Sequence, residues 1–232
     1  MKKTNATELT KDTATYLLYA NPGIGKTHTA HFLSGKTLYI PIDNSATPLA
    51  GNEKIDVVSF NSYNAWDEWN NLMKDLSQYD LSEYDTIFFD NVSELVRSML
   101  ANLGRDGKNN RVPAQGDYLR IDYFLLDSIR FIQSLGKRIV ITAWETTDKW
   151  DLENGQQINR AYPDIREKIR NNFMGLCQVV GRLTINPETK ERGFILQPTN
   201  YIFAKNQLDN RKGCKQEEIF SIHNTEVEGE DE

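Results

Sequence analysis

The sequence predicts an α/β protein: a mostly parallel central sheet with helices on both faces and an antiparallel extension formed by C-terminal strands. Three observations lead to this prediction. Short apolar runs alternate with helix patterns over residues 14–143, an order typical of parallel βαβ units. A glycine-rich loop joins the first apolar run to the first helix pattern. In the last third of the chain the runs are short and joined by turns, which favours antiparallel pairing.

The elements of the first half follow from their apolar spacing and their boundary residues. Residues 14–20 form a buried strand that ends in Asn-Pro-Gly, and the helix that follows over residues 26–33 is stopped by Gly35. An apolar stripe also predicts a helix over residues 66–76. Three further strands are expected over residues 37–42, 55–60 and 87–90.

The second half begins with two predicted helices, over residues 93–103 and about 118–135, the latter ended by Gly136. A strand over residues 138–143 closes the alternating part of the chain. The antiparallel extension is expected to consist of strands over residues 178–185, 193–197 and 201–204.

Length and composition favour one domain. The 232 residues are 39% hydrophobic and 26% charged, which can bury a core and excludes disordered, fibrous and membrane-spanning classes. We expect a flexible N-terminus over residues 1–13, one domain over residues 14–222, and an acidic disordered tail over residues 223–232. No secretory signal or apolar span is visible, so we expect a cytoplasmic protein without membrane contact.

Cysteine spacing argues against disulfide-rich and zinc-binding proteins, and net charge argues against proteins that coat nucleic acid. Cys177 and Cys214 lack the spacing of a disulfide framework or a zinc site. The formal net charge of -6 argues against coating nucleic acid by bulk electrostatics, although it leaves room for a local basic groove.

The segment from Ala20 to Thr27, Ala-Asn-Pro-Gly-Ile-Gly-Lys-Thr, matches a phosphate-binding loop with alanine in place of the first glycine. Glycines let the backbone turn its N–H groups toward phosphate. Lys26 supplies a charge for the β- and γ-phosphates, and Thr27 a hydroxyl for Mg²⁺. The expected cofactors are therefore ATP and Mg²⁺, with the nucleotide held by Asn21, Pro22, Gly23, Ile24, Gly25, Lys26, Thr27 and His28.

Polar residues at other strand ends complete the predicted site. Asp90 ends an apolar strand and is expected to hold the metal beside Thr27. Asn91, not glutamate, follows Asp90, so the water-activating carboxylate is open between Asp43 and Glu145. Thr142, at the end of another strand, is a candidate to sense the γ-phosphate.

The order of these motifs and strands along residues 14–205 resembles the RecA-like and AAA-type ATPase class. More specifically, it resembles small phage-encoded P-loop proteins related to RecA-like single-strand annealing ATPases. The resemblance rests on the loop, the interposed strand 55–60, the strand ending at Asp90 and the strand end Thr142-Ala-Trp-Glu145. It implies a RecA-like P-loop fold and ATP-dependent action on single-stranded DNA in recombination or replication. It also implies homo-oligomers with nucleotide at the subunit interface, in the cytoplasm of a bacterial host.

Two departures from the family pattern concern catalysis. RecA-like proteins usually carry a catalytic glutamate two positions after the aspartate of the second strand, whereas this chain has Asp43-Asn44-Ser45. The resemblance therefore leaves the rate of hydrolysis open. The family's Lys-x-Arg pair, which acts on a neighbouring subunit, is reduced here to Lys205 with Gln207, so Lys205 and Arg211 are the candidates for that role.

The resemblance also places DNA contacts in two loops. The first spans residues 104–112 and carries Arg105, Lys108 and Arg111; the second spans residues 144–160 and offers Lys149 and Trp150, a charge and a ring suited to backbone and bases.

Two other functions remain open at this point. One is a nucleotide-switched loader or scaffold that hydrolyses ATP slowly and recruits a replication or single-strand-binding protein. The other is a small-molecule P-loop kinase, which is disfavoured because no arginine-rich lid is visible.

Overall fold

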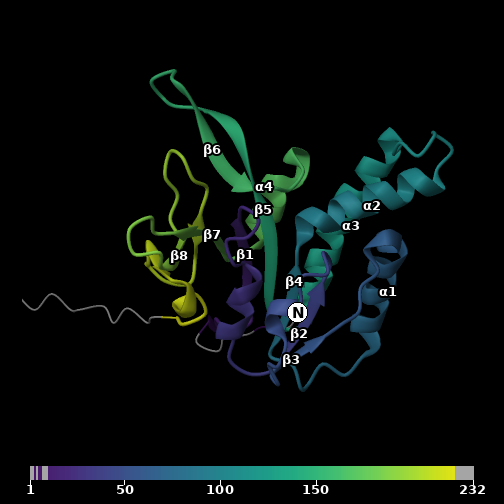
Figure 1. The fold of residues 1–232 in the computed structure, drawn as a ribbon, viewed down its shortest axis with the longest axis horizontal. Helices are drawn as coiled ribbons and strands as arrows, with labels where there is room; N and C mark the ends of the chain where they lie inside the picture. Colours follow the sequence, from purple (N-terminus) through teal and green to yellow (C-terminus); the bar gives the residue numbers. More distant parts are fainter. Residues whose placement is uncertain (1–2, 4, 7–9, 223–232) are drawn as a thin grey trace, which may run out of the picture.

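The computed structural model describes residues 3, 5, 6 and 10–222, and its centre is a twisted sheet (Figure 1). The strand order is β10-β8-β7-β1-β5-β4-β2-β3, with β6 paired to β5 and β9 paired to β7. The bounds are β1 Thr15–Ala20, β2 Thr37–Pro41, β3 Ile55–Val57, β4 Thr86–Asp90, β5 Arg138–Asp151, β6 Gln157–Pro163, β7 Val179–Ile185, β8 Arg192–Ile195, β9 Lys205–Asn206 and β10 Gly213–Lys215.

The strands β3, β2, β4, β5, β1 and β7 run parallel, while β6, β8, β9 and β10 pair antiparallel. The predicted fold class, a mostly parallel α/β sheet with an antiparallel C-terminal extension, is confirmed. The prediction for residues 178–185 was wrong in one respect, because β7 lies parallel to β1. A parallel pair needs a crossover, and helix α4 (Glu167–Leu176), which the sequence analysis missed, provides it.

The four α-helices of the described chain pack on one face of the sheet. They are α1 (Ala65–Gln78), α2 (Val92–Asp106), α3 (Gln115–Ser134) and α4, and they share a core with the sheet residues Leu17, Tyr19 and Ile40. The opposite face is covered by the 3-10 helix Thr27–Phe32 and by the segment around Phe220. The helix after the phosphate loop is thus a short 3-10 helix, in keeping with its weak helix formers threonine and histidine.

The helices expected at 66–76, 93–103 and 118–135 are confirmed, each with longer bounds. Two further predictions were wrong. Residues 144–160 are not a loop: β5 continues to Asp151 and pairs with β6 as a projecting hairpin (Figure 1). Residues 201–204 form only a single bridge, between Ile202 and Ala161. The hairpin was missed because its exposed, polar strands lack the apolar signal of the buried strands.

No helix of the described chain is long and apolar enough to cross a membrane. The acidic tail predicted over residues 223–232 lies outside the described residues.

Candidate functional site

The phosphate loop connects the end of β1 to the 3-10 helix Thr27–Phe32. Gly23 (φ +82°) and Gly25 (φ +109°) occupy backbone conformations that favour glycine. Lys26 is only 7% exposed, and its ammonium donates to the carbonyl oxygens of Ala20 (3.0 Å) and Asn21 (3.1 Å). The loop therefore holds the lysine by its own carbonyl groups, close to where the strand ends.

Asp90, at the carboxyl end of β4, accepts hydrogen bonds from four hydroxyl groups. Its Oδ2 accepts from Thr27 at 2.6 Å, Tyr39 at 2.5 Å and Ser45 at 3.3 Å, and its Oδ1 accepts from Thr142. The carboxylate is 1% exposed. The donors come from the phosphate loop, from β2 and the turn after it, and from β5, so the fold ties the neighbouring strand ends to this one carboxylate.

A cavity of about 580 Å³ opens beside these residues, a size typical of small-molecule sites. Burial lowers the pKa of the Lys26 ammonium, an effect that the nearby Asp90, Asp43 and Glu145 oppose. The lining residues are Pro22, Gly23, Gly25, Lys26, Thr27, His28, Asp43, Ser45, Pro48, Asp90, Trp144 and Arg192.

These residues fit ATP with Mg²⁺. A phosphate would give the buried Lys26 ammonium an anionic partner in place of neutral carbonyls. The Thr27 hydroxyl and the Asp90 carboxylate are adjacent oxygen ligands of the kind Mg²⁺ prefers, and Mg²⁺ is usually completed by phosphate and water. Within the described part of the chain no three His, Cys, Asp or Glu residues cluster as metal ligands, so Thr27 and Asp90 would share the ion with the nucleotide.

A family model described as an AAA domain matches residues 12–208. The chain belongs to this AAA family. Two solved structures are similar to it in fold: a KaiC-like protein from the hyperthermophilic archaeon Pyrococcus horikoshii OT3 and the RadB recombinase. The first has 14% identity and a TM-score of 0.45, covering 81% of this chain and 79% of the other. The second has 11% identity and a TM-score of 0.48, covering 79% and 80%. No curated protein matches the sequence.

The two candidates for water activation in the AAA domain lie in different surroundings. Asp43 lines the cavity, where its Oδ2 accepts from Asn91 Nδ2 at 2.7 Å and its Oδ1 from the Ser45 N–H at 3.1 Å. Burial raises the pKa of Asp43. Glu145 does not line the cavity and instead accepts two hydrogen bonds from Arg182, at 2.7 and 2.8 Å. Asp43, but not Glu145, thus lines the cavity beside the phosphate loop.

Asn91 explains why the residue after Asp90 is not an acid. Its side-chain oxygen accepts from the Glu94 N–H at 2.9 Å and caps α2, while its amide nitrogen donates to Asp43. A carboxylate here would repel Asp43, whereas the amide orients it.

Asp43→Asn is expected to lower the ATP hydrolysis rate about 100-fold or more, the usual contribution of a general base, while Glu145→Gln stays within about 10-fold of wild type. A general base must be ionised, and the pKa of Asp43 lies above the usual aspartate value. The wild-type rate should therefore fall with decreasing pH at a higher pH than for an ordinary aspartate, and Asp43→Asn should lose this acid limb. A pH profile of phosphate release measures both. A larger loss in Glu145→Gln would reverse the assignment.

The other residues predicted to bind the nucleotide either line the cavity or support the residues that line it. His28 lines the cavity and packs against Phe32 at 5.4 Å between ring centroids. Ile24 packs on the apolar cluster beneath the loop, and Asn21 contributes its carbonyl to Lys26. Thr142 donates to Asp90, so its hydroxyl orients that carboxylate.

Lys205 and Arg211 were the candidates for contacting the nucleotide of a neighbouring subunit, and in this chain the charged group of each is already hydrogen-bonded. The Lys205 ammonium donates to the carbonyls of Met174, Gly175 and Cys177 at the end of α4. The Arg211 guanidinium donates to Asp209 at 2.8 Å and to the Glu218 carbonyl at 2.8 Å. Both side chains hold this chain's own C-terminal region together.

Arg192, at the start of β8, is a site residue that sequence reasoning missed. It lines the phosphate-loop cavity, and a Cβ at Gly25 would lie 3.1 Å from its Nε. The residue is 167 positions from Gly25 in sequence, by subtraction of their numbers, and only the pairing of β8 with β7, and of β7 with β1, brings it here. No local motif signals it.

The predicted DNA-contacting residues lie on two projections. Arg105 belongs to α2 rather than to a loop, and its guanidinium donates to the Tyr63 carbonyl and lies 3.8 Å from that ring's centroid. Lys108 and Arg111 are exposed in the connection from α2 to α3, and Lys149 and Trp150 are exposed on β5 of the hairpin.

Proposed function

We propose that this AAA domain binds ATP with Mg²⁺ through the phosphate loop and hydrolyses it, with Asp43 as the water-activating carboxylate. The observation that carries the proposal is the meeting of Lys26, Thr27 and Asp90 in one cavity. MgATP, when bound, supplies a phosphoryl group open to attack by water. Lys26 would exchange its carbonyl partners for phosphate, Thr27 and Asp90 would hold the metal, and Asp43 would accept the proton of the attacking water.

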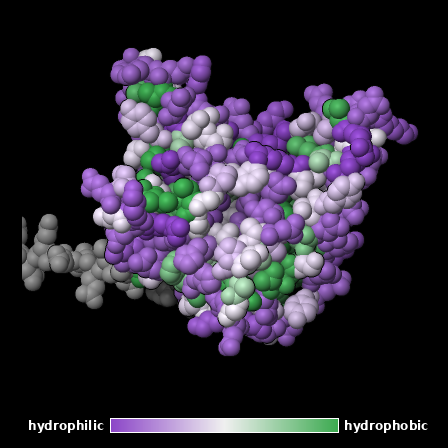
Figure 2. All heavy atoms as spheres, viewed as in Figure 1, coloured by the Kyte–Doolittle hydropathy of each residue, from purple (hydrophilic) through white to green (hydrophobic). Residues whose placement is uncertain are grey.

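We further propose that the domain acts on single-stranded DNA. Support comes from the hairpin β5–β6 and the connection between α2 and α3, which project at the same end of the molecule, the top of the view in Figure 1. Figure 2, seen from the same side as Figure 1, shows both projections as largely hydrophilic, with small hydrophobic spots. A surface of this kind suits a charged, solvated ligand better than an apolar partner.

The hairpin offers one stacking face. Trp150 is 43% exposed, and the Arg160 guanidinium lies 4.7 Å from its ring centroid. The same guanidinium lies 5.7 Å from the Tyr162 ring and 5.6 Å from the Phe203 ring. Lys149 points to the opposite face of the hairpin, because successive strand residues alternate. A base would therefore stack on Trp150 with its phosphate near Arg160, while Lys149 contributes a more distant charge.

Trp150→Ala is expected to weaken binding of a single-stranded oligonucleotide about 10-fold, because stacking on an aromatic side chain stabilises by roughly 1–3 kcal/mol per base. Fluorescence anisotropy at low salt with Mg²⁺ and ATP measures the affinity. Tyr79→Ala is the matched control, since Tyr79 is 60% exposed at the end of α1. Equal affinities of wild type and Trp150→Ala would remove the hairpin from the DNA surface.

A nucleotide-switched loader is the second candidate function, and one observation favours it. Glu145, one of the two predicted bases, is held by Arg182 and does not line the cavity, so hydrolysis would depend on Asp43 alone and would be slow if Asp43 is a poor base. Slow hydrolysis that DNA does not stimulate, together with nucleotide-dependent binding of a replication or single-strand-binding protein, would favour the loader. The phage origin, the bacterial cytoplasm and the homo-oligomer belong to the proposal on the strength of the resemblance alone.

A further inference from the structure

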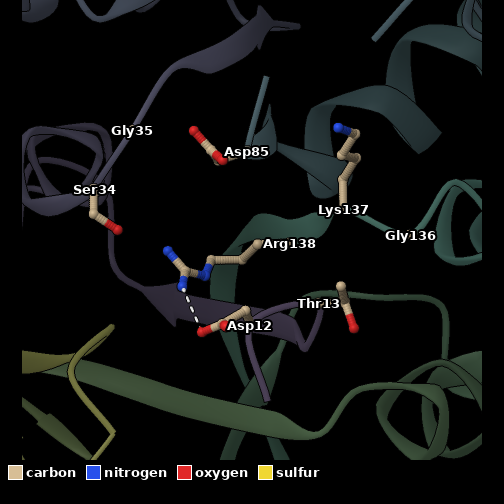
Figure 3. A pocket seen from close by; sticks show the side chains of 8 residues that line it. All are labelled: Asp12, Thr13, Ser34, Gly35, Asp85, Gly136, Lys137 and Arg138. Atoms are coloured by element: carbon tan, nitrogen blue, oxygen red, sulfur yellow. Dashed lines mark ion pairs between the residues drawn. The ribbon is translucent and has the colours of Figure 1, made fainter. Parts of the chain in front are cut away.

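A second cavity, of about 420 Å³, lies at the end of the sheet opposite the phosphate loop (Figure 3). Its lining residues stand just before or at the starts of β1, β2, β4 and β5, whereas the phosphate loop follows the carboxyl end of β1. Because these strands are parallel, the two cavities occupy opposite edges. The proposed ATPase does not use this cavity, which is lined by Asp12, Thr13, Ser34, Gly35, Asp85, Gly136, Lys137 and Arg138.

The buried guanidinium of Arg138 has only a distant, exposed carboxylate to balance its charge. Its side chain is 9% exposed, its Nε has no hydrogen-bond partner among the residues that the structure describes, and its guanidinium points into the cavity (Figure 3). The ion pair found for it joins Nη2 to Asp12 at 3.8 Å, and that carboxylate is 78% exposed. By comparison, Arg182 lies 2.7 Å from the buried Glu145. Buried charges are normally paired closely, yet within the described part of the chain Arg138 has only the distant Asp12 carboxylate and the Phe220 ring, whose centroid lies 5.9 Å from its guanidinium.

Two residues beside Arg138 in the sheet, Thr37 and Thr86, also carry buried polar atoms that lack a hydrogen-bond partner in the described part of the chain. Thr37, Thr86 and Arg138 are in register on β2, β4 and β5, so their side chains point to the same face. Each carries a buried polar atom for which the described residues 3, 5, 6 and 10–222 offer no hydrogen-bond partner: the two threonine hydroxyls and the arginine Nε. Unsatisfied buried polar groups are rare in proteins, and this row of three ends at Arg138, the one member that lines the cavity.

The rim of the cavity adds further polar groups. Lys137 supplies a second cation, and Thr13 and Ser34 supply hydroxyls. Asp85 is fixed away from Arg138 by the Lys36 N–H, which donates to its Oδ2 at 3.0 Å. Gly35 (φ +76°) makes room for this carboxylate, since a Cβ there would lie 2.0 Å from Asp85 Oδ2. Asp12 is thus the negative group that an incoming anion would have to displace from Arg138.

We propose that this cavity is a binding site for a small ligand with a phosphate or carboxylate group, which pairs with Arg138 and displaces Asp12. Arg138 forms the floor of the site, where it would bind the anion, while Lys137, Thr13 and Ser34 line the walls and the Lys137 ammonium points away from Arg138 (Figure 3). The site is independent of the phosphate loop and of the proposed ATPase activity.

The test follows the Nε–Hε signal of Arg138 and the backbone amides of Gly35 and Lys137 by ¹H–¹⁵N NMR. Sodium phosphate and sodium acetate are titrated into the full chain at constant ionic strength, with chloride as the reference anion. We expect saturable shifts of these signals with at least one of the two probes, and the stronger probe identifies the anion class. Lys26→Ala should retain the shifts, which separates this site from phosphate bound at the phosphate loop.

Two substitutions make the test specific. Asp12→Asn should tighten binding about fivefold, because it removes a competing charge about 4 Å from Arg138. Arg138→Gln should abolish the shifts at Gly35 and Lys137, and if that variant does not fold, Arg138→Lys should weaken them. Non-saturable shifts, equal shifts with chloride, or an Asp12→Asn variant that binds no better than wild type would overturn the proposal.

Discussion

Replacement of Lys26 by alanine is expected to lower the rate of ATP hydrolysis by at least about 100-fold, the usual cost of removing one electrostatic stabiliser of a transition state. Lys26 is the cation of the phosphate loop, and the loop's own carbonyls hold its ammonium beside the cavity. Phosphate release at saturating ATP and Mg²⁺ measures the loss.

Lys168→Ala is the matched control, because Lys168 is exposed on α4 and the same atoms are removed. Its rate should equal that of wild type. A Lys26→Ala variant that folds and retains most of the wild-type rate would show that hydrolysis takes place elsewhere or comes from a contaminant.

Asp90→Asn should have the second large effect, acting on both activity and stability. Four hydroxyls donate to this carboxylate, and hydrogen bonds to a charged group stabilise by about 1.5–3 kcal/mol each. The asparagine side chain keeps one oxygen that can accept hydrogen bonds. Its NH₂ group is a donor, so it cannot accept from the hydroxyl groups that donate to the second carboxylate oxygen of Asp90. We expect unfolding free energy to fall by about 2–4 kcal/mol and the Mg²⁺-dependent hydrolysis rate to fall about 1,000-fold.

Urea denaturation and phosphate release measure the two effects, and Asp122→Asn separates them. Asp122 is also buried, 4% exposed, and pairs with Arg166 at 2.6 Å, far from the phosphate loop in sequence. It should lose stability yet keep its hydrolysis rate once folded. Equal loss of activity in both variants would mean that Asp90 acts through stability alone.

The parts of the fold that the sequence predicts are those governed by local patterns. The run from Tyr16 to Ala20 is apolar throughout because β1 is buried on both faces. Gly23 and Gly25 signal the loop because their positive φ angles exclude most other residues. Lys26 and Thr27 follow within the same short motif, so the core of the site is readable without a structure.

The parts that the sequence does not predict depend on distant pairing. The projecting part of the hairpin, residues 145–151 of β5 and 157–160 of β6, is stabilised mainly by strand pairing because it is little buried, so no apolar alternation marks it. The parallel direction of β7 depends on the α4 crossover, and the entry of Arg192 into the cavity depends in turn on β7 and β8. Likewise, only the structure separates Asp43, which lines the cavity, from Glu145, which pairs with Arg182.

The most direct test of the nucleotide site is equilibrium binding of ATP with Mg²⁺, measured by titration calorimetry on wild type, Lys26→Ala and Asp43→Asn. Wild type and Asp43→Asn should bind one ATP per chain with similar affinity, because Asp43 serves the reaction rather than the nucleotide. Lys26→Ala should bind at least about 10-fold more weakly, from the loss of a charge-assisted hydrogen bond. Equal affinity of wild type and Lys26→Ala, or no binding by wild type, would contradict the assignment of the phosphate loop.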